Sequence, residues 1–390
     1  MFPQNGEKVP EIRFAGFSDD WEQRKLEDVV EFLDTMRKPL EGAKRISGPY
    51  PYYGASGIVD YVDGYLFDEE LILLSEDGAN ITDRNYPVCF IASGKYWVNN
   101  HAHVLRTKKE NENNFICNSL ERKDYTQYNT GMAMPKLNKE TCRKIPVLCP
   151  VFKEQQKIGD YFRSLDNLIT LHQRKCEQTK KLKKYMLQKM FPQNGAKVPE
   201  IRFDGFTYDW EQRKLSDVLD IVTKRNGEKY GKEEVLSVSD EYGCINQIKF
   251  QGRSFAGEDI SNYKIVDTGD IIYTRSPLKS KPYGIIKVVG DEIGIVSPLY
   301  IVNKVKEGNN SQFIYRVFDS PEKTNKYLSP LVRKGAKNTM NISNDEWLSG
   351  KIDVAPSYEE QYQIGLYFDH LDHFITLHQR QHKLHLNALL

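Results

Sequence analysis

Residues 1–29 read MFPQNGEKVPEIRFAGFSDDWEQRKLEDV, and residues 190–218 read MFPQNGAKVPEIRFDGFTYDWEQRKLSDV. The two stretches differ at five positions (7, 15, 18, 19 and 27 in the first), so 24 of 29 residues are identical. A repeat of two copies offset by 189 residues is too long and too sparse for a solenoid. It predicts that the chain contains two copies of one structural plan.

A second repeated stretch closes each copy. Residues 155–174 read QQKIGDYFRSLDNLITLHQR, residues 361–380 read QYQIGLYFDHLDHFITLHQR, and 13 of the 20 positions match. The middle segments, roughly 30–150 and 219–356, show no obvious resemblance to each other. We therefore predict a pseudo-twofold internal repeat with four parts, which are a first domain over 1–150, a first spacer helix over 151–190, a second domain over 191–356 and a second spacer helix over 357–390.

The closing stretches have the pattern of long helices. The first shows a 3-4-3-4 spacing that is typical of a coiled-coil seam, at Ile158, Tyr161, Leu165, Leu168, His172, Lys175, Thr179, Leu182 and Met186. The second repeats this seam at Ile364, Tyr367, Leu371, Phe374 and His378, and it follows Ser357 and Glu360 at capping-box spacing. Two matched seams in one chain favour an antiparallel pair within the chain. A coiled coil between two chains is the alternative.

The composition fits a folded protein of two or three domains. The chain has 390 residues, of which 39% are hydrophobic and 28% charged, which excludes collagen-like and disordered classes. It contains no run of 18 apolar residues, and residues 1–20 hold no apolar signal core, so we expect no membrane-spanning helix and no secretory signal. The expected fold class is α+β, with two globular domains separated by two long antiparallel coiled-coil helices.

Cysteine usage and charge limit the possible functions further. The six cysteines form no Cys-x-x-Cys pair, which argues against a zinc ribbon and fits a reducing cytoplasm. The formal net charge is only +1, so a role in nucleic-acid binding must rest on local patches. Residues 174–189 carry seven Lys or Arg and one acid, which predicts a solvated helix face or, alternatively, a contact with DNA phosphates.

The first middle segment contains a candidate DNA-binding strand, SGKYWVNNHAHV (93–104). Alternation with a period of two places Tyr96, Val98, Ala102 and Val104 on one face and Lys95, Trp97, Asn99, His101 and His103 on the other. Adjacent Lys, Asn and His side chains suit base edges or phosphates, although an ordinary half-buried strand is an equal alternative. The two histidines lack nearby cysteines or carboxylates, so we expect no metal site. The candidate DNA-binding residues here are Lys95, Asn99, His101 and His103.

Four loops add further candidates, with plain solubility as the alternative role. PYYGASG (51–57) is a Tyr- and Gly-rich turn in which backbone could approach a phosphate. RSPLKSKPY (275–283) is predicted to be a hairpin tip with three cations, and RKGAKNTMN (333–341) matches GMAMPKLN (131–138) in its distance from the closing helix. The candidate DNA-binding residues in these loops are Tyr53, Ser56, Lys136, Arg275, Lys279, Lys281, Lys334, Lys337 and Asn338.

The sequence offers no support for catalysis. It contains no Gly-x4-Gly-Lys-Ser/Thr loop that would cradle a nucleotide phosphate. The Ser297-Pro298-Leu299-Tyr300 sequence only faintly echoes the catalytic loop of amino-methyltransferases, and no glycine-rich cofactor loop precedes it. No constellation of a nuclease or of a Ser/His/Asp hydrolase is visible. We therefore expect a non-catalytic protein with no metal and no cofactor of its own.

The shared motifs carry a family resemblance. They are the paired PEIRF-x-GF…W-x-x-R/K-x-L openings (10–26 and 199–215) and the paired EQ-x-x-IG-x-YF-x-x-LD-x-x-ITLHQR helices. With middle segments such as YYGASGIVDY and KYWVNNHAHVL, the chain resembles the specificity subunit of type I restriction–modification systems over essentially its whole length. The second spacer helix departs from this pattern because it ends six residues before its twin would end.

The resemblance implies a division of labour between subunits. The two domains would each recognise one half of a split site in double-stranded DNA, and two modification (adenine methyltransferase) subunits would dock on the shared parts. Restriction (endonuclease and translocase) subunits would then join. S-adenosylmethionine is expected on the modification subunits, and ATP and magnesium on the restriction subunits. Residues of the shared parts that we expect at the partner interface are Trp21, Trp210, Gln155, Phe162, Gln361 and Phe368.

The repeat leads to the same function by a separate argument. Identical shared segments imply two copies of one protein partner, and dissimilar middles imply two different ligand surfaces. A spacer between them would fix a number of base pairs, so we expect an asymmetric bipartite target with a gap of about half to one helical turn. With its near-zero net charge, the isolated chain should bind DNA weakly. The alternatives are a coiled-coil adaptor with two protein-binding domains and, less favoured, a self-sufficient DNA methyltransferase.

Overall fold

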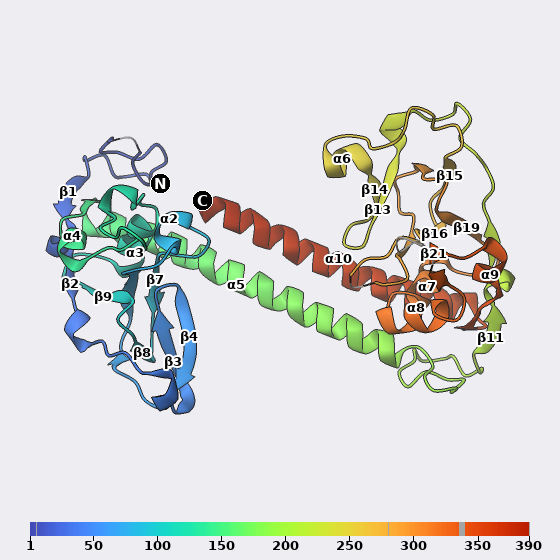
Figure 1. Ribbon diagram of the computed structural model, residues 1–390, viewed down its shortest axis with the longest axis horizontal. Helices are drawn as coiled ribbons and strands as arrows, with labels where there is room; N and C mark the ends of the chain where they lie inside the picture. Colours follow the sequence, from blue (N-terminus) through green and yellow to red (C-terminus); the bar gives the residue numbers. More distant parts are fainter. Residues whose placement is uncertain (5, 280, 335–339, 390) are drawn as a thin grey trace. The chain divides into compact units, whose positions relative to one another are not determined.

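The computed structural model describes residues 1–4, 6–279, 281–334 and 340–389 (Figure 1). By contacts the chain divides into two compact units, Met1–Leu171 with Lys383–Leu390 and His172–His382. The two long helices begin close to the predicted positions, because α5 spans Phe152–Lys189 and α10 spans Tyr358–Leu389. The division between the units nevertheless falls inside α5 and not at residue 150. The first half of this helix therefore packs with the first domain.

A four-stranded antiparallel sheet forms the centre of the first unit. Its order is β2 (Val30–Phe32), β9 (Ala102–Thr107), β6 (Leu71–Ser75), β7 (Cys89–Ala92). The LILLS sequence of β6 is buried on both faces. Ile72 and Leu74 pack against α3 (Asn113–Glu121) and the start of α5, and Leu71 and Leu73 pack toward a second sheet. The apolar run in the sequence is thus explained by burial from two sides.

The second sheet and the short elements complete the first domain. This sheet has the order β4 (Gly57–Val62), β3 (Ser47–Gly54), β8 (Lys95–Val98), β5 (Phe67–Asp68). The short helices are α1 (Leu26–Val29), α2 (Asn80–Asp83) and α4 (Lys139–Arg143). The predicted single strand over 93–104 is wrong, because β8 ends at Val98 and β9 starts at Ala102 after a turn. The predicted apolar face is nevertheless confirmed, because Tyr96, Val98, Ala102 and Val104 are all buried in one core cluster. The predicted polar face is wrong at Asn99 and His103, which are buried as well.

The second unit contains the same central sheet, although its middle segment shows no obvious sequence resemblance to that of the first. The order β12 (Leu219–Ile221), β19 (Ile301–Val305), β16 (Ile271–Tyr273), β17 (Ile286–Val288) matches that of the first unit strand for strand. The helix α7 (Ser311–Val317) follows β19 as α3 follows β9. The remaining elements are β13 (Leu236–Ser239), β14 (Gly243–Asn246), α6 (Gln247–Gln251), β15 (Lys264–Val266), β18 (Gly294–Val296), α8 (Pro321–Leu328), β20 (Arg333–Lys334), β21 (Met340–Asn341) and α9 (Asn344–Ser349).

Each repeated opening pairs with the end of its own middle segment. The identical EQRK sequences form β1 (Glu22–Lys25) and β11 (Glu211–Lys214). The first pairs antiparallel with β10 (Pro146–Cys149), and the second with β22 (Lys351–Val354). The chain therefore enters and leaves each domain at one place, directly before the long helix. We call α5 and α10 the frame helices.

The buried face of α5 differs from the predicted seam at every second position. Tyr161, Leu168 and Leu182 are exposed (40%, 38% and 44%), and Phe162 and Cys176 are buried in their place. In a heptad repeat the apolar residue that follows Ile158 can come three or four residues later. In the structure it comes four residues later, at Phe162. The predicted seam is therefore confirmed at Ile158 and Leu165, which are buried, and one residue short at Tyr161 and Lys175, where Phe162 and Cys176 are buried instead.

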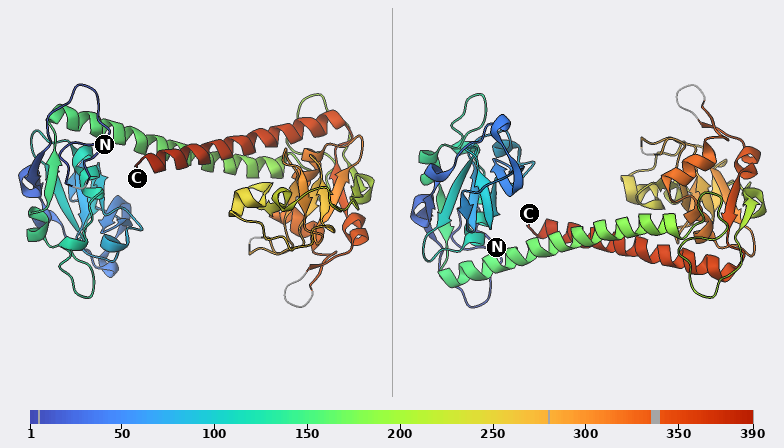
Figure 2. Two further views of the ribbon diagram at one scale, coloured as in Figure 1. Left: turned by 90° about the horizontal axis from the view of Figure 1, so that it is seen from above. Right: turned by 90° about the horizontal axis from the view of Figure 1, so that it is seen from below.

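The antiparallel pair of helices expected within the chain is observed inside the second unit. Nδ1 of His172 lies 3.1 Å from Nδ1 of His378, and Nζ of Lys183 lies 2.7 Å from Oδ1 of Asp372. Residue numbers rise along one helix as they fall along the other, and the two helices run side by side there (Figure 2). His172 and His378 are equivalent in the repeat, so the local twofold passes between them. No helix in the described ranges is long and apolar enough to cross a membrane.

Candidate nucleic-acid interface

Four loops of the first domain meet at one end of the central sheet. The Ser75 hydroxyl donates to the carbonyl of Ala55, and the backbone N–H of Asn99 donates to Tyr53. Backbone N–H groups of Glu76 and Gly78 donate to the carbonyls of His101 and Pro135. The turn at 54–57, the segment after β6, the turn at 99–101 and the loop over 129–136 therefore form one surface. We call it the loop end of the first domain.

Exposed polar and apolar side chains share this loop end. Ser56, Asn100, His101 and Lys136 are exposed, as are Met132 and Met134 (105% and 59%). Sequence reasoning missed Asn100, because strict alternation assigned its position to the buried face. The turn-forming Asn-Asn pair was the signal that could have identified it.

The cations of this domain have acidic neighbours. Nδ1 of His101 lies 2.8 Å from Asp77, and Nζ of Lys136 lies 3.5 Å from Glu76. Lys95 lies outside the loop end, 4.0 Å from Asp68 and over the ring of Tyr65. Exposed ion pairs contribute at most about 1 kcal/mol, so these side chains can exchange their partners for a ligand. The surface therefore presents donors and acceptors more than net positive charge.

Three of the predicted residues of this domain are not free on the surface. His103 is fully buried, Asn99 is 7% exposed, and Tyr53 lies half-buried between the rings of Phe90 and Tyr96. His103 and Asn99 were wrong as DNA-binding candidates, since their side chains face the interior. The Asn99 carboxamide instead accepts the backbone N–H of His101 and so shapes the turn.

His103 is the centre of a buried charged cluster. Its Nδ1 lies 2.7 Å from Oδ2 of Asp34, and its Nε2 lies 2.8 Å from the carbonyl of Leu137. Burial opposes a charge on the ring, but the interactions with Asp34 and Cys142 together outweigh it and raise the pKa of His103 to about 10. Burial likewise disfavours charge on Asp34, yet the hydrogen bond from His103 lowers the pKa of its carboxyl. A protonated imidazole thus ties β9 to the loop over 129–136.

We expect the first unit to lose stability on the alkaline side. The pKa of His103 is higher in the folded state than in the unfolded chain, so its protonation stabilises the folded state fully at a pH below about 6.5, the pKa of the unfolded side chain. This stabilisation is lost as the pH rises through about 10. Urea unfolding between pH 6.5 and 10.5 should show a falling free energy of unfolding. His103→Gln should remove most of this alkaline pH dependence, and its other expected effect is on Asp34, whose pKa His103 lowers. Equal slopes for the two proteins would contradict the assignment.

The second domain brings its loops together around Arg275. Arg275 lies two residues after the end of β16 (Ile271–Tyr273), in the connection that corresponds to the segment after β6 in the first domain. Its guanidinium donates from Nε to the carbonyl of Leu299 (2.7 Å) and from Nη1 to that of Ile342 (3.3 Å). Burial lowers the pKa of Arg275 slightly from its very high ordinary value. The predicted hairpin is confirmed, because the strands on either side of Arg275, β16 and β17, pair antiparallel. DNA binding by Arg275 stays a prediction, and much of its hydrogen-bonding capacity is already used.

A hollow of about 300 Å³ lies beside Arg275. Its walls include Arg333 and Asn341, which the sequence analysis did not select although both stand in the quoted 333–341 segment. The side chain of Arg333 is 83% exposed and lies 3.0 Å from Glu346. We call this surface the loop end of the second domain. Lys337 and Asn338 lie outside the described residues, as does the side chain of Lys334.

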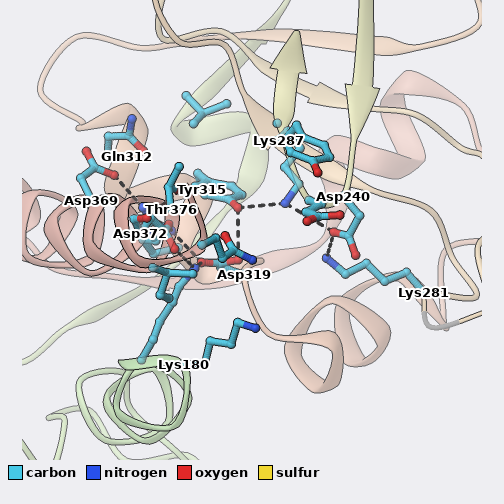
Figure 3. A pocket seen from close by; sticks show the side chains of 18 residues that line it. Lys180, Asp240, Lys281, Lys287, Gln312, Tyr315, Asp319, Asp369, Asp372 and Thr376 are labelled. Atoms are coloured by element: carbon cyan, nitrogen blue, oxygen red, sulfur yellow. Dashed lines mark hydrogen bonds and ion pairs between the residues drawn. The ribbon is translucent and has the colours of Figure 1, made fainter. Parts of the chain in front are cut away.

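The remaining two predicted cations behave differently. Lys279 is exposed on the β16–β17 connection. Lys281 is only partly exposed, because its ammonium pairs with Asp240 beside a pocket of about 530 Å³ (Figure 3). Lys281 is therefore a weaker candidate for DNA contact than Lys279.

All six predicted partner-interface side chains are buried inside this chain, so none is available to a partner. Trp21 and Phe162 lie in the core of the first unit, and Trp210 and Phe368 in that of the second. Gln155 and Gln361 are 1% exposed, and their amides donate to the carbonyls of Pro150 and Ala355. The repeated motif was correctly identified, but it is repeated because it attaches each domain to its helix.

Apolar side chains remain exposed on equivalent turns of the two frame helices. Leu168 and Leu171 of α5 are 38% and 41% exposed, and their repeat equivalents in α10, Phe374 and Leu377, are 50% and 37% exposed. The first member of each pair was predicted to be buried in the seam. We call these four residues the apolar flank. The repeated ITLHQR sequence was the signal for it, since both copies keep Leu at this site.

The described residues contain no group of three or more His, Cys, Asp or Glu placed to hold a metal ion. All six cysteines are free thiols. Five of them are buried.

Comparison with known proteins assigns both halves of the chain to one family. The family described as type I restriction modification DNA specificity domain matches residues 18–181 and 208–388. A type I restriction enzyme specificity subunit of Haemophilus influenzae is 34% identical over 155 residues, which is 40% of this chain and 39% of that protein. The type I restriction enzyme MjaVIII specificity subunit of Methanocaldococcus jannaschii is 23% identical over 289 residues, which is 68% and 66% of the two chains.

A solved structure shares the fold along nearly the whole chain. The S subunit of a type I restriction–modification system from M. genitalium superposes with a TM-score of 0.68 at 12% sequence identity, covering 98% of this chain and 96% of that one. The fold is therefore that of this structure, although the sequences have diverged widely. The matches to the two curated relatives span only 39% and 66% of their lengths.

Proposed function

This chain belongs to the type I restriction–modification DNA specificity domain family, and we propose that it is the subunit that recognises the DNA target for such a system. In this proposal it directs adenine-modifying and restriction subunits to an asymmetric, bipartite site in double-stranded DNA in the cytoplasm. It performs no catalysis itself. S-adenosylmethionine, ATP and magnesium act on the partner subunits.

The observation that carries the proposal is one sheet with two different loop ends. The central sheet has the strand order β2-β9-β6-β7 in the first domain and the equivalent order β12-β19-β16-β17 in the second. The loops at matched positions nevertheless carry different groups, with His101, Lys136 and Asn100 in the first and Arg275, Arg333 and Asn341 in the second. One scaffold with two unlike polar surfaces suits two unlike half-sites.

The side chains of the loop ends suit contacts with DNA bases, but their acidic neighbours suit a weak overall affinity for DNA. Exposed Asn, His, Arg and Lys side chains offer the donors and acceptors that match base edges in the major groove. Three acids lie close to these side chains, with Asp77 beside His101, Glu76 beside Lys136 and Glu346 beside Arg333. Their negative charges reduce the net attraction of the loop ends to phosphate. We propose that the chain alone binds DNA weakly and that its partners add phosphate contacts.

The frame helices suit the role of a spacer. The 38 residues of α5 extend about 57 Å along the helix axis. We propose that their length sets the number of unread base pairs between the half-sites. We further propose that the apolar flank, repeated on both helices, receives two copies of the modification subunit. The same flank supports the second candidate function, an adaptor that binds only proteins, and DNA footprinting of the assembled complex separates the two.

Target selection with paired variants tests this function. We expect Asn100→Ala/His101→Ala to relax base preference in one half-site and Lys279→Ala/Arg333→Ala to relax it in the other. Each altered base contact should cost about 1–3 kcal/mol of discrimination. The measurement is selection from a randomised duplex library by the complex with modification subunits. Lys304→Ala, an exposed cation on β19 outside the loop end, is the control.

A continuous or palindromic selected target would overturn the proposal. So would variants in either domain that weaken binding without changing the preferred sequence, since contacts to phosphate alone produce that result. Transfer of a methyl group by the isolated chain would favour the self-sufficient methyltransferase.

A further inference from the structure

The two frame helices carry opposite charges at one equivalent position. Thirteen of the 20 residues in their shared stretch are identical, but Arg163 of α5 corresponds to Asp369 of α10. Both residues face the domain that their own helix supports. Helix residues that are identical in α5 and α10 offer the same contacts to either domain. Residues 163 and 369 do not, because one is positively and the other negatively charged.

In the first unit the cation belongs to the helix. Nη2 of Arg163 lies 3.2 Å from Oε1 of Glu112 and 4.0 Å from Glu70 of the domain. The Glu112 carboxylate also caps α3, because its Oε2 accepts the backbone N–H of Phe115 at 2.6 Å. Its side chain is 13% exposed, so its charge is poorly solvated. The domain thus presents a carboxylate to the helix.

In the second unit the cation belongs to the domain. Nη2 of Arg316 in α7 donates to Oδ1 of Asp369 at 2.6 Å, and its Nη1 donates to Oδ2 of Asp372 at 2.6 Å. The Arg316 side chain is only 2% exposed. Asp369 and Asp372 line one side of the 530 Å³ pocket together with Asp319 (Figure 3). Lys183 of α5 adds a second cation, 2.7 Å from both Asp319 and Asp372.

The two contacts use equivalent positions of the frame helices, but their partners lie at opposite ends of the equivalent helices, with Glu112 at the N-cap of α3 and Arg316 in the last turn of α7. Asn310 replaces Glu112 as the helix cap, and its side chain accepts the N–H of Phe313 at 3.0 Å. The backbone N–H of Glu112 donates to the Gln155 carboxamide, and that of Asn310 to Gln361. The second domain therefore lacks a carboxylate where the first has one, and its helix carries one instead.

We propose that Arg163 and Asp369 are charge keys that match each domain to its own frame helix and reject the other domain. This inference concerns assembly of the chain and does not depend on what the domains bind. A first domain placed on α10 would set Glu112 against Asp369, and a second domain placed on α5 would set Arg316 against Arg163. Like charges brought together at these partly buried sites are unfavourable, so repulsion disfavours the wrong pairing, while Arg316 keeps its partner Asp319 in either arrangement.

Variants of the full chain test the keys one domain at a time. Arg163→Asp creates the wrong pairing with Glu112 and Glu70. We expect it to lower the unfolding temperature of the first unit by about 3–6 °C and to speed amide exchange in the first turn of α3 about tenfold. The second unit serves as the internal control. Hydrogen exchange followed by mass spectrometry resolves the two units.

The decisive variant is Glu112→Asn/Arg163→Asp, which installs the second unit's residues at both positions and keeps a helix cap. We expect it to recover at least half of the lost unfolding temperature and the slow exchange in α3. Glu112→Asn alone should have a smaller effect than Arg163→Asp. If the double variant is as unstable as Arg163→Asp, the charge at this position does not select the domain and the proposal fails.

A chain with its two domains exchanged between positions extends the test. We expect the exchanged chain to unfold at lower temperature than the parent and to regain stability when Arg163→Asp and Asp369→Arg are added together. The same two substitutions in the parent chain should destabilise both units. An exchanged chain as stable as the parent would refute the proposal directly.

Discussion

Replacing Glu360 with alanine is expected to lower the free energy of unfolding of the second unit by about 3–5 kcal/mol, because it leaves a buried guanidinium without its partner. The Glu360 carboxylate is 1% exposed and pairs with Arg202, with Nε at 2.7 Å and Nη2 at 2.8 Å. It also accepts the indole N–H of Trp210 at 3.1 Å. Three hydrogen bonds from the repeated opening thus end on one carboxylate of α10.

Urea unfolding of the full chain, followed by probes in each unit, measures this effect. Glu359→Ala is the matched control, since Glu359 precedes Glu360 in the same helical turn and is exposed. We expect the control to change stability by less than about 0.5 kcal/mol. Arg202→Ala should destabilise comparably to Glu360→Ala, because it leaves the carboxylate buried alone. A loss below about 1 kcal/mol for Glu360→Ala would show that this pair does not fasten the opening to the helix.

The first unit repeats this attachment with one contact fewer. Arg13 pairs with Glu154 at 2.7 and 2.8 Å, and Glu154 is fully buried. The indole N–H of Trp21 has no hydrogen-bond partner among the residues that the structure describes, whereas that of Trp210 donates to Glu360. Glu154→Ala should therefore destabilise the first unit slightly less than Glu360→Ala destabilises the second.

The repeat made the organisation of the fold predictable. Identical openings and closing helices require identical local structure, and both EQRK segments indeed form the same strand, paired with the strand that directly precedes the long helix. The common sheet inside the two middle segments could not be predicted in this way. LILLS in β6 and IIY in β16 share only burial on both faces, and many sequences satisfy that condition.

The candidate site was only partly predictable because polarity does not report burial. His103 has the same residue type as His101 two positions away, yet Asp34 compensates its charge from 69 residues upstream in the sequence. A partner so distant in sequence leaves no local signal. The same limit explains the six buried partner-interface candidates, since a repeated residue can be kept by an internal contact as well as by an external one.

Breaking the apolar flank is expected to remove the protein partners proposed here without unfolding the chain. Leu171→Asp and Leu377→Asp each place a charge on a side chain that is already 41% or 37% exposed in the isolated chain. The cost to folding should therefore stay below about 1 kcal/mol. In a complex the same carboxylate would be desolvated, which costs several kcal/mol and weakens binding by a factor of a hundred or more.

Because the flank occurs once on each frame helix, the two single variants should each lose one partner copy and the double variant both. Native mass spectrometry of the chain mixed with its modification subunit counts the copies bound. Leu384→Asp serves as the control. Leu384 also lies on α10 and is 66% exposed, but it is outside the apolar flank. If each single variant still carries two partner copies, the partners dock elsewhere, and the exposed leucines have another role.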